Sequence, residues 1–121
     1  MSKRILTVDD SRTMRDMLKA ALTTAGFETV QAEDGVHGLE VLGQNSVDLI
    51  ITDINMPNMD GFELIERIRG EDKYRGLPIL VLTTESSPEK KARARESGAT
   101  GWLVKPFQPE QLVSVIRRVS P

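Results

Sequence analysis

Five side chains that can bind a metal ion or a phosphoryl group follow short apolar runs in this sequence. They are Asp9, Asp10, Asp53, Thr83 and Lys105. Carboxylates that lie close together repel one another and raise one another's pKa. A hard cation relieves that repulsion, and Mg²⁺ typically binds one or two carboxylates together with a substrate phosphate. Gathered at one place, these side chains would form a Mg²⁺ site beside an ammonium and a hydroxyl group.

Asp53 is the best candidate for a nucleophile, because it stands between the acidic pair and the Thr83 and Lys105 positions. A carboxylate can attack a phosphoryl group and form an aspartyl phosphate. The phosphoryl oxygens then need positive charge and hydrogen-bond donors around them, which Lys105 and the Thr83 hydroxyl can supply. Taken alone, each residue also has a structural explanation, such as helix capping for the acidic pair or the start of a turn for Asp53.

Alternating strands and helices would bring these residues together. Five apolar runs read as strands, at residues 4–8, 29–32, 47–52, 77–83 and 101–104. Segments with helical periodicity separate them, and this strict alternation predicts a doubly wound α/β fold with helices on both faces of a parallel sheet. Open parallel sheets bind ligands beyond the carboxyl ends of their strands, which is where the five candidates would lie.

The fourth predicted helix, residues 89–97, differs from the others. It has good helix propensity but no large apolar residue, so it can bury little area against the sheet. A weakly anchored helix is a candidate for the part that moves, although an ordinary exposed helix explains the pattern equally well.

Composition limits the class of protein. The chain has 121 residues, a length that suits one domain (1–121). Its net charge of -2 disfavours nucleic-acid binding. It has no cysteine, which excludes thiolate chemistry. No apolar run is long enough to cross a bilayer. We expect a soluble, cytoplasmic, monomeric protein without an output domain.

The motifs together resemble the response-regulator receiver family over the whole chain. The resemblance rests on Asp9-Asp10, on the run Asp53-Ile54-Asn55-Met56-Pro57, on Thr83 and on Lys105-Pro106. It implies a flavodoxin-like (βα)5 sandwich with strand order 2-1-3-4-5. It also implies that the side chains of Asp10 and Asp53 bind Mg²⁺, with Asp9 acting through water and Asn55 through its backbone carbonyl.

The resemblance further implies how a receiver changes shape. Thr83 would be the switch hydroxyl and Trp102 the switch aromatic, where Tyr or Phe is more familiar. Trp102 as a permanent part of the core or of an interface is the alternative. Lys105-Pro106 would be a cis peptide. Phosphorylation would alter the surface of the fourth helix, fifth strand and last helix, where Lys90, Lys91, Arg93 and Arg95 would suit an acidic partner. A solvated helix face is the alternative explanation of these basic residues.

Within that family the chain is similar to single-domain chemotaxis regulators of the CheY type. Asn55 and Glu85 match the pair found in regulators that lose phosphate quickly. The implied partners are a histidine kinase of the CheA type, the flagellar motor switch protein or another target, and a possible phosphatase. A phosphate sink and a regulator of a pathway other than motility are the alternatives.

Two rival functions differ in class. A phosphatase of the haloacid dehalogenase type also forms an aspartyl phosphate, but it needs a second Asp where this chain has Asn55, which cannot exchange a proton at neutral pH. A pure interaction module without phosphorylation would not need the complete set of five candidates. We therefore expect a phosphoacceptor with self-catalysed phosphorylation and dephosphorylation only, and not an enzyme.

Overall fold

Five strands and five α-helices alternate along the chain. The computed structural model describes residues 2–121. In chain order the elements are β1 (Arg4–Val8), α1 (Arg12–Thr24), β2 (Glu28–Ala32), α2 (Gly35–Gln44), β3 (Leu49–Thr52), α3 (Gly61–Arg69), the 3-10 turn η1 (Asp72–Tyr74), β4 (Ile79–Thr83), α4 (Pro88–Ser97), β5 (Gly101–Val104) and α5 (Pro109–Val119).

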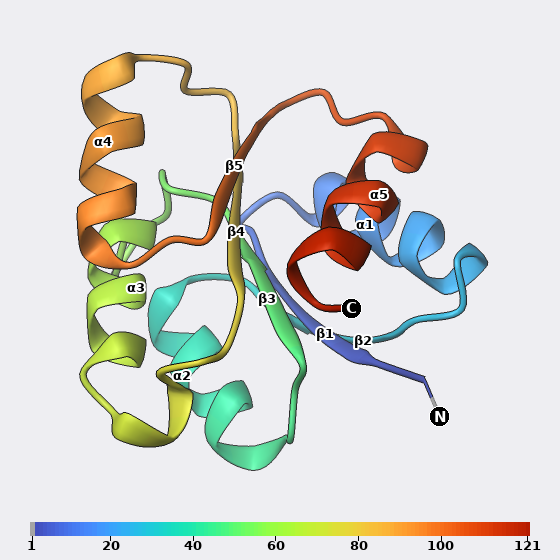
Figure 1. Ribbon diagram of the computed structural model, residues 1–121, viewed down its shortest axis with the longest axis horizontal. Coiled ribbons are helices and arrows are strands. Elements are labelled where there is room, and N and C mark those ends of the chain that lie inside the picture. Colours follow the sequence, from blue (N-terminus) through green and yellow to red (C-terminus); the bar gives the residue numbers. More distant parts are fainter. Residues whose placement is uncertain (1) are drawn as a thin grey trace.

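The strands form one parallel sheet in the order β2-β1-β3-β4-β5. Helices α1 and α5 cover one face, and α2, α3 and α4 cover the other (Figure 1). Both the doubly wound fold and the 2-1-3-4-5 order are therefore confirmed. Because all strands run the same way, their carboxyl ends lie at one edge of the sheet.

Two apolar cores fill the spaces between the sheet and its helices. One contains Leu6, Val8, Ile50, Phe62, Ile65, Ile68 and Val81 on the side of α2, α3 and α4. The other contains Ile5, Leu18, Leu22, Ile51, Leu82, Leu112 and Ile116 on the side of α1 and α5. Burial on both faces explains why the central strands are nearly continuous in apolar residues.

Side-chain caps start four of the helices. Ser11, Asp34, Asp60 and Ser87 each accept a hydrogen bond from the backbone N–H three residues later. Such caps satisfy one of the amide groups that the first helical turn leaves without a partner. These four residues therefore decide where the loops above the sheet edge end.

Helix α4 is the most weakly anchored of the five, as its sequence predicts. Ala94 is its one buried residue among those described, whereas α3 buries Phe62, Leu64, Ile65 and others. At its end Gly98 has φ 116°, a left-handed conformation, and its carbonyl accepts a hydrogen bond from Arg69 Nε at 3.0 Å. Helix α4 is thus tied to α3 mainly at its C-terminal end.

Strands β3 and β4 begin later in the structure than the starts at residues 47 and 77 that the sequence predicts. Pairing of β3 begins at Leu49 because the Arg4 N–H is taken by Asp48 Oδ2, at 2.8 Å, just before the ladder. Pairing of β4 begins at Ile79, directly after Pro78, which has no N–H to donate. Neither difference moves the carboxyl end of a strand, where the candidate residues lie. Within residues 2–121 no helix is long and apolar enough to span a membrane.

Candidate functional site

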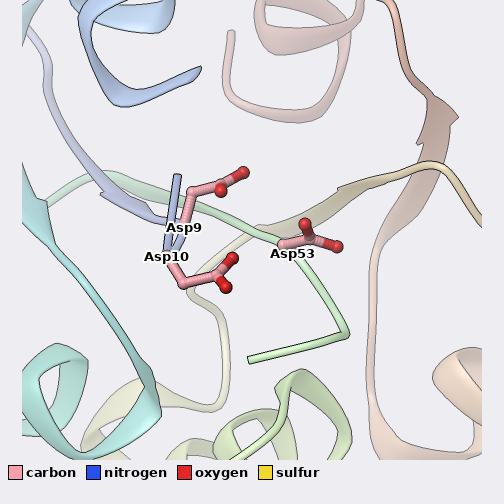
Figure 2. Close-up of side chains that lie close together, drawn as sticks. All are labelled: Asp9, Asp10 and Asp53. Atoms are coloured by element: carbon pink, nitrogen blue, oxygen red, sulfur yellow. The ribbon is translucent and has the colours of Figure 1, made fainter. Parts of the chain in front are cut away.

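Three carboxylates meet at the carboxyl edge of the sheet. Asp9 and Asp10 follow β1, and Asp53 follows the neighbouring strand β3 (Figure 2). Each offers a carboxylate oxygen, and these oxygens lie within 4.8 Å of one another. Oxygen ligands of this kind are the ones that Mg²⁺ prefers, so the residues present fit that ion. The juxtaposition predicted from the strand ends is confirmed.

Lys105 joins the two acidic strand ends. Its Nζ donates to Asp9 Oδ2 at 2.8 Å and to Asp53 Oδ2 at 2.7 Å. The Lys105 side chain is only 11% exposed, so solvent screens these charges less than it would at the surface. The ammonium group reaches the site from the end of β5, and the Lys105-Pro106 peptide that follows it is cis, as the resemblance predicts.

Local contacts fix the Asp53 side chain and the loop behind it. Asp53 is 8% exposed, and its Oδ1 accepts a hydrogen bond from the Ile54 N–H at 2.6 Å. The loop closes back on itself where the Gly61 N–H donates to the Ile54 carbonyl at 2.8 Å. A Cβ at position 61 would overlap the Asp53 carbonyl oxygen, so only glycine allows this approach.

Burial and pairing act against each other on the charged groups. Burial raises the pKa of Asp9 above its ordinary value, although the Lys105 hydrogen bond and the Ser11 N–H act in the opposite direction. Burial alone would lower the pKa of Lys105, but its bonds to Asp53 and Asp9 outweigh that effect and raise it. Lys105 is therefore a permanent cation at neutral pH.

The two predicted switch residues lie on β4 and β5. Thr83 is fully buried at the end of β4, and its hydroxyl accepts a bond from the Glu85 N–H at 3.3 Å. Trp102 on β5 is half-buried and packs against the core beneath α4. Its indole N–H is buried and has no hydrogen-bond partner in the described part of the chain. Their switch roles stay predictions.

Asn55 and Glu85, the two residues that match the pair found in regulators that lose phosphate quickly, are in contact. The Asn55 side chain donates from Nδ2 to Glu85 Oε1 at 3.2 Å, and Lys90 Nζ donates to the same oxygen at 2.9 Å. These bonds, that from Lys90 first and that from Asn55 second, lower the pKa of Glu85. Asn55 thus reaches across from the loop after β3 to the loop after β4.

The basic surface predicted on α4 is partly engaged within the chain. Lys90 is paired with Glu85, and the Arg93 guanidinium lies 4.1 Å from the centre of the Phe62 ring. Lys91 and Arg95 are exposed. The role of this surface in binding a partner stays a prediction.

Several contacts around the site have no signal in the sequence. The Arg15 guanidinium donates to the Asp9 carbonyl at 2.6 Å, and the Asn58 amide donates to Asp34 Oδ2 at 2.8 Å. Arg15 lies six residues after Asp9, and Asn58 lies 24 residues after Asp34. Lys90 could have been noticed as a cation near Glu85, but its spacing of five residues matches no regular helical pair.

The family described as the response regulator receiver domain matches residues 5–117. The chain belongs to this family. It is 42% identical to a Campylobacter jejuni CheY homologue over 111 residues, which are 90% of this chain and 85% of the relative. Helicobacter pylori CheY1 is 39% identical, and the match covers 90% of each protein. The structure of Vibrio cholerae CheY4 is 46% identical, covers 98% of this chain and 99% of its own, and has a TM-score of 0.94.

This receiver domain resembles chemotaxis proteins of the CheY type and is not a classical enzyme. The phosphatase alternative loses its support, because the receiver match spans nearly the whole chain and Asn55 occupies the place of the second acid.

Proposed function

We propose that the chain is a stand-alone response regulator that accepts a phosphoryl group on Asp53 from a histidine kinase. The observation that carries this function is the bridging of Asp9 and Asp53 by Lys105 beside Asp10. Asp53 is a buried nucleophile with two further carboxylates and the Lys105 ammonium beside it. This arrangement suits transfer of a phosphoryl group better than it suits binding of a neutral ligand.

The transfer forms a bond between a carboxylate oxygen of Asp53 and phosphorus. The bond from phosphorus to the donor's imidazole nitrogen breaks, and the nitrogen keeps the electron pair. Lys105 holds positive charge beside Asp53 throughout. Asp9, Asp10 and Asp53, with the Asn55 backbone carbonyl, would hold Mg²⁺, which neutralises charge on the phosphoryl oxygens when bound.

The new charge would act on α4 and β5. A phosphoryl group adds about 1.5 to 2 negative charges. Thr83 would turn toward it and free space for Trp102, altering the surface of α4, β5 and α5. The weak anchoring of α4 supports this direction of change, because a helix with one buried residue is the easiest of the five to shift.

The relatives support a chemotaxis role and cytoplasmic location. We propose the flagellar motor switch protein as the target and a kinase of the CheA type as the donor, because the similar proteins are chemotaxis proteins over 85% or more of their length. A phosphate sink that drains a shared kinase is the alternative within the same family.

Affinity capture tests the target. Immobilised protein would be exposed to purified motor switch protein, with and without a beryllofluoride phosphoryl mimic and Mg²⁺. Binding that increases with the mimic in the wild type and not in Asp53→Ala supports the motor target. Equal binding in both states would exclude phosphorylation-dependent motor control, while phosphotransfer from a CheA-type kinase without any motor binding would favour the sink.

A further inference from the structure

Three side chains connect the first turn of α4 to the loop that follows Asp53. Lys90 Nζ and Asn55 Nδ2 both donate to Oε1 of Glu85, at 2.9 Å and 3.2 Å. Asn55 stands two residues after Asp53, and Glu85 two residues after Thr83. Lys90 is thus the outermost member of a chain of contacts that ends beside the acceptor.

The position of Lys90 is itself well defined. It lies in the first turn of α4, where its backbone N–H donates to the capping Ser87 hydroxyl at 3.1 Å. The cap fixes the backbone of Lys90 relative to the loop that carries Glu85. Its side chain then reaches back along the helix toward that loop, so the ion pair does not depend on the loosely packed remainder of α4.

We propose that Lys90 is a positioning residue for loss of the phosphoryl group, because it holds Glu85 and, through Glu85, the amide of Asn55 in place beside Asp53. This inference rests on the proposed function. Glu85 has a flexible side chain that is 28% exposed, and without Lys90 it would sample several rotamers. Because the NH₂ group of Asn55 faces Glu85, the side-chain carbonyl oxygen of Asn55 points away from Glu85.

The step that this arrangement serves is hydrolysis. The oxygen of a water molecule forms a bond to phosphorus, the bond from phosphorus to Asp53 breaks, and the carboxylate recovers the electron pair. The proton of the water leaves with inorganic phosphate or passes to solvent. Such a reaction is fast only when the water is held in line with the bond that breaks, and a fixed amide oxygen is an acceptor that can hold it.

The expected effect is modest, because the pair is partly exposed. Side-chain exposures of 44% for Lys90 and 28% for Glu85 place it among surface ion pairs, which are screened by salt. Lys90→Met should therefore slow phosphate loss about 2- to 5-fold. Lys90→Arg keeps the charge and should remain close to the wild type.

The test follows the loss of ³²P from labelled Asp53 after removal of the donor. Lys19→Met is the matched control, since it removes the same charge from an exposed position on α1. The Glu85→Ala variant should be slow, and Lys90→Met combined with it should be no slower. Added salt should slow the wild type toward the rate of Lys90→Met and leave that variant nearly unchanged.

Equal rates in the wild type, Lys90→Met and Lys19→Met would overturn the inference. Additive effects of Lys90→Met and Glu85→Ala would also overturn it, because residues that act through one another are not additive. Failure of the proposed function looks different: the wild type would then take up no label on Asp53 at all.

Discussion

The Lys105 ammonium lies 2.7 Å from the Asp53 carboxylate although 52 residues separate them in the chain. The bond exists because β3 and β5 run parallel, with β4 between them, and deliver both side chains to the same edge. It means that the charge opposite the acceptor is already in position before any phosphoryl donor arrives. Such preorganisation is the main way in which a protein stabilises transferring charge.

Removing that charge should impair phosphorylation. Lys105→Met loses a charge-assisted hydrogen bond to the acceptor, a loss of about 1.5 to 3 kcal/mol, or about 10- to 100-fold in rate. The measurement is the initial rate of Asp53 labelling from acetyl phosphate with Mg²⁺. A melting curve for the variant controls for its folding. Wild-type labelling in a folded Lys105→Met protein would show that Lys105 has only a structural role.

Trp102 should report the change of state, and its signal is unambiguous because it is the single tryptophan. Beryllofluoride with Mg²⁺ should change its fluorescence intensity or emission maximum as the half-buried indole changes its surroundings. Asp53→Ala should abolish the response, and Thr83→Ala should reduce it. A wild type that binds the mimic without any fluorescence change would favour the alternative of a permanently packed Trp102.

Two glycine substitutions should have opposite effects on stability. Gly61→Ala would push a methyl group against the Asp53 carbonyl, and overpacking of this kind costs about 2 kcal/mol even after the gain in helix propensity. Gly43→Ala, at an exposed position of α2 with nothing within 4 Å, should stabilise by about 0.5 kcal/mol. Urea unfolding measures both. A Gly61→Ala protein as stable as the wild type, or more stable, would contradict the close approach at Gly61.

Acid should weaken the cap of α2. The His37 N–H first, and then the Asn58 amide, donate to Asp34 and lower its pKa below the ordinary value. A carboxyl whose folded-state pKa is depressed stabilises the fold above about pH 4, and that stability is lost as pH falls through the folded-state pKa.

Asp34→Asn keeps an oxygen for the His37 N–H but loses the acceptor for the Asn58 amide, so it should be less stable than the wild type by about 1 kcal/mol at neutral pH. The difference should shrink below about pH 4. Urea unfolding midpoints of the two proteins at neutral pH and at acid pH provide the measurement. Glu33→Gln, a change at an exposed neighbouring carboxylate, is the control. A constant difference at both pH values would mean that the charge of Asp34 does not matter.

Periodicity was sufficient to predict the sheet and its helices. The apolar runs of β3 and β4 are buried on both faces, and the capping residues Ser11 and Asp60 start helices where their types predict. The larger errors were at the strand starts near Asp48 and Pro78, where a side chain or a missing N–H replaces the ladder. The alternation of apolar and polar residues does not show where a side chain or a proline interrupts strand pairing.

The candidate site was predictable as a set of strand ends and not as a network. Parallel strands guarantee that Asp9, Asp53 and Lys105 share an edge, whatever fills the connections. They do not determine that one ammonium bridges both carboxylates, or that Lys90 reaches Glu85 from five residues away. Those contacts depend on rotamers and loop shapes, which only the packed structure defines.

Locating the phosphoryl group tests directly whether Asp53 is the phosphoacceptor. The protein would be incubated with ³²P-labelled acetyl phosphate and Mg²⁺, digested, and its peptides mapped by mass spectrometry. We expect one acid-stable, base-labile label per chain on Asp53, absent in Asp53→Asn and absent when a chelator removes the metal. Label that persists in Asp53→Asn, or a wild type that stays unlabelled with Mg²⁺ present, would contradict this role of Asp53.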